Sequence, residues 1–276
     1  DMGFKTANKA GKNILKINPE YKDPNTGFTK QSNIRVEINS IYSIQSYCKT
    51  NNLTNITDRL INFTKKTSVK NSDGEFINSF NNDDFNFRVT IKNETMLNKR
   101  NNEIKLILDD WTNLKKNFRY MNRVTFTHPD YPVKVDMSIV KTNKNISGKN
   151  NMTYTIESAG VFDNEEFYEI EIEVDNTKIG SGTQWISDNY IIFTNMLRQV
   201  IKYILSGLQQ TNYPISYPIQ KSILNQYIML INKDSDIESI KITPKNFIGP
   251  SSTTLQLANL NNSDSDNNII SVRKNY

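Results

Sequence analysis

Cysteine and histidine are almost absent from this chain of 276 residues, which contains one of each, Cys48 and His128. A single cysteine excludes a disulfide framework, and the two residues together are too few for a Cys/His zinc site or for Cys-His catalysis. His128 precedes Pro129 and is interpreted as a turn residue rather than a catalytic base. Any bound metal is therefore expected to have oxygen ligands.

Long apolar runs are also missing. The first thirty residues contain no run with the length of a signal peptide or a membrane span, so an intracellular protein without a membrane partner is expected. The formal net charge is +5 and the isoelectric point about 9.0, which suits a polyanionic partner such as RNA, a nucleotide or phosphate. The alternative is that the positive charge only keeps the protein in solution.

Composition divides the chain into three parts. Residues 1–30 are polar and contain Pro19, Pro24 and several lysines, which predicts a flexible N-terminal arm. Residues 31–232 carry the regular apolar patterns of a folded domain. Residues 233–276 include a stretch rich in Ser, Asp and Asn, which predicts a linker leading into another module.

Short runs in which apolar and polar residues alternate dominate the middle part, and each predicts a strand with two unlike faces. These runs are residues 34–38, 85–91, 118–126, 133–140, 153–157 and 168–174. Apolar residues that recur every three or four positions predict helices at residues 104–114, 188–208 and 221–232. The expected fold class is therefore α+β.

The last of these strands, YEIEIEV, places Glu169, Glu171 and Glu173 on one face. Neighbours on the same face of a strand lie about 7 Å apart, so the three carboxylates raise each other's pKa unless a cation neutralises them. Mg²⁺ or Mn²⁺ is the cation that suits oxygen ligands. The alternative is a solvated acidic strand that pairs with nearby lysines and binds no metal.

Basic residues occupy the polar faces of the preceding strands. A sheet with one solvated face explains any single strand of this kind. A closed barrel explains them together, because its polar faces then line a water-filled tunnel while helices cover its apolar outside. The residues concerned are Arg88, Lys92, Arg119, Arg123, Lys134 and, with the opposite charge, Asp136.

These strands resemble the triphosphate tunnel metalloenzymes, in particular the RNA triphosphatase domain of mRNA capping enzymes from large, mimivirus-like DNA viruses. The resemblance covers about residues 33–232 and is carried by IRVEINSI, DDFNFRVT, FRYMNRVTFTHPDYPVKVDMSIVK, YEIEIEVDN and LSGLQQTNYPISYP. It implies an antiparallel eight-stranded β-barrel with a polar interior, flanked by α-helices. PKNFIGPSSTTLQL and SVRKNY resemble the start of a guanylyltransferase module, but no KxDG motif follows.

The resemblance implies a viral, metal-dependent mRNA 5′-triphosphatase that removes the γ-phosphate of nascent RNA as the first step of mRNA capping. Its expected partners are 5′-triphosphate RNA and the guanylyltransferase and methyltransferase modules of the same polypeptide, in the host cytoplasm or the virion. Two alternatives stay open. One is a catalytically inactive tunnel domain that binds RNA ends or scaffolds the capping module, and the other is a hydrolase of nucleoside triphosphates or polyphosphate.

The resemblance also implies roles for individual residues. The expected metal ligands are Glu37, Glu171 and Glu173, and Glu169 is expected to position the attacking water. The orienting residues are expected to be Asp136 and Glu157. The residues expected to bind the triphosphate, of which the arginines also neutralise charge in the transition state, are Arg88, Lys92, Arg119, Arg123 and Lys134.

One departure from the family concerns the first tunnel strand. That strand usually carries the pattern ExE, whereas this chain has Arg35 and Glu37 at the corresponding positions, or Glu37 and Asn39 if the register shifts by two residues. One carboxylate fewer is therefore expected on the metal.

Overall fold

The computed structural model describes residues 2–8, 10–23, 26–146, 149–180, 183, 185 and 190–231. The chain divides into two compact units, Asp1–Ile215 and Ser216–Tyr276. The described part of the second unit is largely one helix, α5 (Tyr217–Ile231). The predicted linker and module start at residues 233–276 lie outside the described residues.

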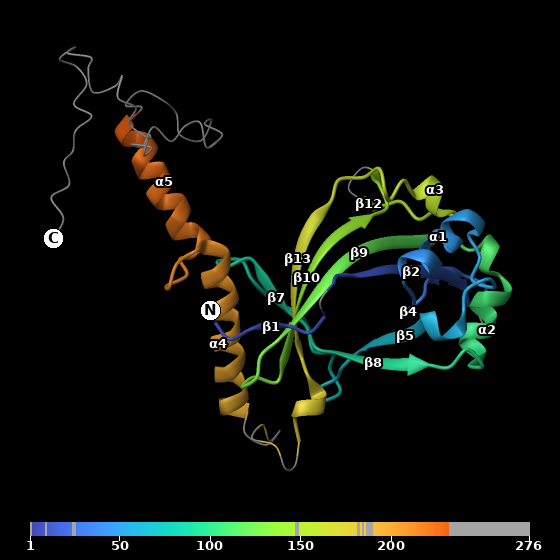
Figure 1. The fold of residues 1–276 in the computed structure, drawn as a ribbon, viewed down its shortest axis with the longest axis horizontal. Coiled ribbons are helices and arrows are strands. Elements are labelled where there is room, and N and C mark those ends of the chain that lie inside the picture. Colours follow the sequence, from blue (N-terminus) through green and yellow to red (C-terminus); the bar gives the residue numbers. More distant parts are fainter. Residues whose placement is uncertain are drawn as a thin grey trace. The chain divides into compact units, whose positions relative to one another are not determined.

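An antiparallel sheet of seven strands forms the first unit and curls into a half-barrel (Figure 1). The strand order is β13 (Phe167–Val174), β10 (Val133–Thr142), β9 (Lys116–Thr127), β2 (Lys12–Lys22), β4 (Ile34–Asn39), β5 (Ile61–Ser68) and β8 (Lys92–Leu97). Two short strands extend this path, where β1 (Lys5–Thr6) pairs with β9 and β3 (Thr29–Gln31) pairs with β2. Outside the sheet are two small ladders, β6 (Phe80–Asn82) with β7 (Phe87–Val89) and β11 (Asn145–Ile146) with β12 (Lys149–Asn150).

Helices and 3₁₀ turns follow or connect these strands. The helices of the first unit are α1 (Ile41–Thr50), α2 (Asn102–Asp109), α3 (Ile156–Ala159) and α4 (Tyr190–Gln209). The 3₁₀ turns are Asp58–Leu60, Trp111–Asn113 and Asn176–Lys178. Local capping explains where α2 begins, because the side chain of Asn101 accepts a hydrogen bond from the backbone N–H of Glu103 at 2.8 Å.

The main core lies on one face of the sheet, where apolar residues from four strands meet α1 and α2. On β2, Leu15 and Ile17 are fully buried, and they alternate with polar neighbours that point to the opposite face. Tyr47 of α1 packs edge-on against Trp111, with their ring centroids 6.3 Å apart. Each large side chain buried in this way contributes about 1.5 to 3 kcal/mol. We call this the helical face, and its other core residues include Val36, Ile38, Phe63, Ile104, Ile107 and Phe118.

A second, smaller core holds α4 against the same face at the other end of β10. Met196 and Val200 of α4 pack with Val133, and Ile172 of β13 contributes partly buried surface. Between the two cores β10 is uncovered, because Met137 and Ile139 are 47% and 41% exposed. The predicted coat of helices over the apolar face is therefore incomplete.

The antiparallel α+β class is confirmed, and so is the position of most predicted elements. The runs at residues 34–38, 118–126, 133–140 and 168–174 form β4, β9, β10 and β13, and the three predicted helices overlap α2, α4 and α5. The expected closed barrel is not formed, because no pairing joins β13 to β8 in the described residues.

The predicted flexible arm is wrong for Lys12–Lys22. This segment is β2, which pairs on one side with β4 and on the other with β9, in the middle of the sheet. The prolines and lysines of the segment suggested a loop, but its NILKIN pattern alternates like that of the other strands. Burial of one face against the helices outweighs the loop-like composition.

Two other predicted strands differ from the structure. Residues 153–157 make a single bridge, between Thr153 and Lys116, and then enter α3, which the side chain of Thr155 caps. Of residues 85–91, only Phe87–Val89 is a strand, and it pairs with β6 in a separate hairpin. The hairpin forms locally because its connecting residues include Asn86, which adopts a left-handed φ of 52°.

Lys116 is fully buried at the start of β9. Its Nζ donates hydrogen bonds to the backbone oxygens of Leu114 (2.7 Å) and Tyr154 (3.1 Å) and lies 5.0 Å from the centre of the Trp111 ring. Burial lowers the pKa of Lys116 from its ordinary value to about 8, although the nearby Asp110 opposes this change.

We expect this lysine to make stability depend on pH. Between the folded pKa, about 8, and the unfolded value, 10.5, the unfolded chain holds the proton that the folded chain has released, so the free energy of unfolding rises with pH. Urea unfolding at about pH 8 and about pH 9.5 should show a smaller rise for Lys116→Met than for the natural chain. Equal rises would contradict a depressed pKa at this lysine.

Candidate functional site

The face opposite the helices, which we call the polar face, collects charged side chains from most strands of the sheet. Strand register places them in rows: Lys16 of β2 stands opposite Arg119 of β9 and Glu37 of β4. In the next part of the sheet Asp136 of β10 stands opposite Glu171 of β13. The predicted separation of polar and apolar faces is confirmed for these strands.

Arg123 of β9 is the most heavily bonded cation on this face. Its Nη1 donates to Asp136 Oδ2 at 2.6 Å, its Nε donates to Ser138 Oγ at 3.1 Å, and its Nη2 donates to the Glu171 carboxylate. The second oxygen of Asp136 accepts a 2.6 Å hydrogen bond from Thr125 Oγ1. The guanidinium is therefore held in one orientation by three strands, β9, β10 and β13. Asp136 and Ser138 are only 5% and 4% exposed, so these bonds lie where water competes little.

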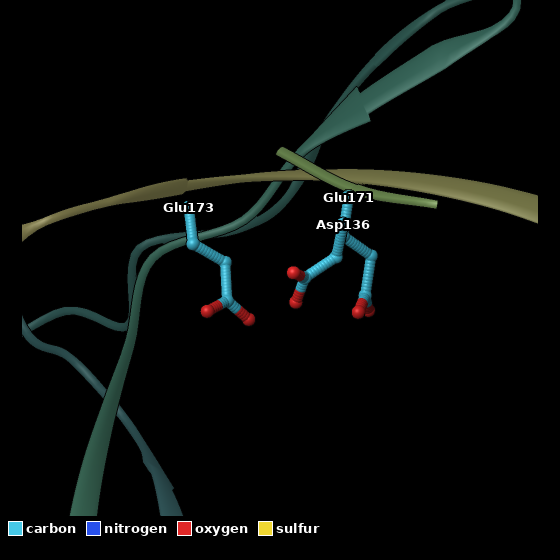
Figure 2. A group of neighbouring side chains, drawn as sticks. All are labelled: Asp136, Glu171 and Glu173. Atoms are coloured by element: carbon cyan, nitrogen blue, oxygen red, sulfur yellow. The ribbon is translucent and has the colours of Figure 1, made fainter. Parts of the chain in front are cut away.

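Three carboxylates converge beside this arginine. Asp136, Glu171 and Glu173 each offer one oxygen, and the three oxygens lie within 4.8 Å of one another. Figure 2 shows all three side chains projecting from the same side of the sheet, with Asp136 and Glu171 next to each other. We call these residues the acidic triad.

The electrostatics differ within the acidic triad. Burial raises the pKa of Glu171, but the positive charges of Arg123, Lys16 and Arg119 outweigh that effect and leave the pKa lowered. The pKa of Glu173 is raised, first by burial and then by the charges of Asp136 and Glu171. Glu173 also makes no ion pair among the residues that the structure describes. It is the carboxylate on which negative charge is least compensated.

The donor set of the acidic triad fits a hard divalent cation. All three ligands are oxygens, which Mg²⁺ and Mn²⁺ prefer, and an added cation would relieve the repulsion that raises the pKa of Glu173. Arg123 already neutralises part of the charge on Asp136 and Glu171, so a cation would share these two carboxylates with the arginine.

Glu37, a predicted metal ligand, is not part of the acidic triad. Its Oε1 lies 2.7 Å from Arg35 Nη2 and 3.7 Å from Lys16 Nζ. Three strands separate β4 from β13 in the sheet, whereas β10 lies next to β13. Asp136, expected to orient other groups, therefore completes the acidic triad, in which Glu37 was predicted as a metal ligand.

Other predicted residues also lie on the polar face. Arg119 forms an ion pair with Glu169, and the Arg119 guanidinium lies 5.9 Å from the centre of the Phe167 ring. Lys134 Nζ lies 3.2 Å from Asp175 Oδ1, at the end of β13. Lys92 of β8 donates to Ser68 Oγ at 2.9 Å. Arg119 thus forms an ion pair with a glutamate of the ExExE strand, and Lys134 stands opposite Glu173 of that strand in the sheet.

Two predicted residues lie elsewhere. Arg88 is exposed on the β6–β7 hairpin, which is outside the sheet, so it does not join the polar face through strand pairing. Glu157 belongs to α3 and accepts a 2.9 Å hydrogen bond from Asn51, the residue that follows α1. It was expected on a strand, but its segment is helical and packs with the main core.

The edge strands β8 and β13 face each other across the polar face. In a flat sheet, strands six positions apart would be about 29 Å apart. Nevertheless Glu94 of β8 contributes to the raised pKa of Glu173 on β13. The sheet therefore curls with its polar face inside, and Glu94, paired with Lys66 of β5, lies on the opposite wall.

Sequence reasoning missed several residues of this face. Lys16 was hidden because its strand was taken for an arm, and Arg35 was noted only as a departure from ExE. The alternation in residues 118–126 and 133–140 puts Thr125 and Ser138 on the polar face. Nothing in the sequence shows that their hydroxyls bond to Asp136 and Arg123. The alternating NILKIN run was the available signal for Lys16.

Comparison with protein-family models, curated proteins and solved structures gives no match to this chain. No helix in the described ranges is long and apolar enough to cross a membrane.

The pair of Arg123 and Asp136 should be strongly coupled. Arg123→Gln leaves two carboxylates without their cation, so it should destabilise the fold, and Asp136→Asn should recover part of that loss. A double-mutant cycle by urea unfolding should give a coupling energy of about 1 to 3 kcal/mol.

A matched control is the exposed pair of Lys99 and Asp58, whose charged atoms are 2.7 Å apart. The same substitutions there, Lys99→Gln and Asp58→Asn, should give a coupling energy below about 1 kcal/mol. Equal coupling in the two pairs would contradict a special role for Arg123 in the site.

Proposed function

We propose that this chain is a metal-dependent hydrolase that removes the γ-phosphate from the 5′-triphosphate end of RNA. The observation that carries the proposal is the position of Arg123, a guanidinium that binds anions, in contact with two of the three carboxylates of the acidic triad. Phosphate oxygens are bound both by guanidinium groups and by divalent cations, and the carboxylates are the groups that would hold such a cation. The inward-curling polar face supports a substrate that is highly charged and fits between two walls.

The residues of the chain take distinct roles in this proposal. Arg123 and Arg119 bind phosphate oxygens and neutralise charge that shifts to the leaving group, an effect that requires donors fixed in advance. Glu169, bonded to Arg119, orients the attacking water. Asp136, Glu171 and Glu173 hold Mg²⁺ or Mn²⁺. When bound, such an ion supplies Lewis-acid polarisation of a phosphoryl oxygen.

The proposal also covers the complete fold, the biological role and the source of the protein. It includes a closed eight-stranded tunnel in the working enzyme, a role as the first step of mRNA capping, and guanylyltransferase and methyltransferase modules in the same polypeptide. It also includes a viral origin, with the host cytoplasm or the virion as the place of action. These parts rest on the resemblance of the sequence to the triphosphate tunnel family.

Release of phosphate from triphosphate-ended RNA, measured with Mn²⁺ and with Mg²⁺, tests this function. Glu171→Gln keeps the size of the side chain but removes its charge, so we expect kcat to fall by about 100-fold or more. Glu103→Gln, on α2 at the helical face, is the matched control and should keep the natural rate. No metal-dependent release by the natural chain, or full activity of Glu171→Gln, would refute the proposal.

The same assay with ATP identifies the substrate class. Comparable rates on ATP and RNA would favour a general nucleoside triphosphatase over an RNA triphosphatase. The sequence resembles RNA triphosphatase domains, so we expect the faster release from RNA.

A second candidate is a domain that binds RNA ends without hydrolysing them. It is favoured by one observation: the carboxylate of Glu37 is already paired with Arg35 and Lys16, so β4 offers no free ligand for a metal. This candidate predicts that triphosphate-ended RNA binds but releases no phosphate with either metal.

A further inference from the structure

Two neighbouring cations of the polar face, Lys16 of β2 and Arg35 of β4, lie outside the acidic triad and outside the predicted phosphate-binding set. They share the single carboxylate of Glu37. The group of three therefore carries a net charge of +1. Most of its surface is removed from water, since the side chains of Lys16, Arg35 and Glu37 are 11%, 16% and 17% exposed.

Unsatisfied hydrogen-bonding atoms gather around this group. In the described residues, four buried side-chain nitrogen or oxygen atoms have no hydrogen-bond partner, and three of them lie on the polar face: Arg35 Nε, Arg119 Nε and Asn117 Oδ1. They belong to β4 and β9, the two strands that flank β2, and β2 places Lys16 between them. A buried donor without a partner costs about 1 to 3 kcal/mol, and the cost is larger for a charged group. The two guanidinium N–H groups, at Arg35 Nε and Arg119 Nε, can donate to an anion, whereas the amide oxygen of Asn117 can only accept.

Lys16 connects this group to the Arg123 group. The charges that act on Lys16 come from Arg35 and Glu37 on β4, from Arg123 on β9 and from Glu171 on β13. Within the part of the chain that the structure describes, the Nζ of Lys16 makes one ion pair, a 3.7 Å contact with Glu37 that is too long for a hydrogen bond. Its three N–H donors are therefore available to an anion that lies between the two groups.

We propose that Lys16 and Arg35, together with the Nε of Arg119, form a second phosphate-binding subsite next to Arg123. Arg35 presents a planar donor and Lys16 a point charge, and this combination suits phosphate oxygens. Glu37 holds both cations in place. The polar face then binds a linear chain of phosphates, with one phosphate at Arg123 and the next at Lys16 and Arg35.

This inference deepens the proposed function, because it assigns the parts of the triphosphate to separate places on the polar face. It also gives Arg35 a role. In a metal site, an arginine in place of a carboxylate removes a metal ligand, whereas in a phosphate site it adds a positive charge that binds the anion.

Calorimetric titration of the full chain with inorganic tripolyphosphate and with orthophosphate, in metal-free buffer, tests the subsite. Arg35→Gln and Lys16→Gln should each weaken tripolyphosphate binding about tenfold, the loss expected for one charge-assisted hydrogen bond. Orthophosphate needs one subsite only, so its affinity should change by about threefold or less. Arg35→Lys keeps the charge and should retain most of the tripolyphosphate affinity.

The matched control is Lys65→Gln. Lys65 lies on β5, the neighbour of β4, and its removal costs the same formal charge, but its side chain pairs with Glu103 at the helical face. This variant should bind tripolyphosphate like the natural chain. Thermal unfolding of every variant shows whether it is folded before it is titrated.

The outcomes separate the two proposals. If Arg35→Gln, Lys16→Gln and Lys65→Gln all bind tripolyphosphate as tightly as the natural chain, the subsite is refuted, whatever the hydrolytic activity. If tripolyphosphate binding depends on Arg35 and Lys16 but the natural chain releases no phosphate from RNA, the subsite is supported and the hydrolase function is refuted.

Discussion

The contacts of Arg123 with Asp136 and Glu171 are the interaction on which the polar face depends. Three acidic side chains on neighbouring strands repel each other, and burial increases that repulsion. One guanidinium from β9 compensates two of them at once and is fixed by Ser138. The same arrangement that stabilises the sheet places a guanidinium, which suits anions, beside carboxylates, which suit a cation.

Curling of the sheet brings the charged side chains of its two edge strands toward each other. The helical face is covered in part by two cores, one under α1 and α2 and one under α4, so the helices bury apolar surface on one side only. The charged side chains are left on the inner side, where Glu94 of one edge strand acts on Glu173 of the other. A flat sheet of this width would keep the two edges too far apart for that effect.

The polar face divides into regions with different net charge. Near β13 carboxylates are in excess, and near β2 and β4 the excess belongs to Lys16 and Arg35. A linear polyphosphate with a bound divalent cation has a matching distribution, since the cation needs carboxylates and the remaining phosphate oxygens need nitrogen donors. Glu37 pairs with Arg35 and Lys16 and lies outside the acidic triad.

The sequence by itself determined the alternation that separates Glu169, Glu171 and Glu173 from Ile170 and Ile172, because side chains on a strand point to opposite faces with a period of two. It also predicted four of the seven strands of the main sheet and three of the five helices that the structure describes. It did not determine which strands are neighbours, because pairing joins residues far apart in the chain. Only the tertiary structure shows that Asp136 lies beside Glu171 and that Glu37 pairs with Arg35. It also shows that part of the predicted arm is the central strand β2, which carries Lys16.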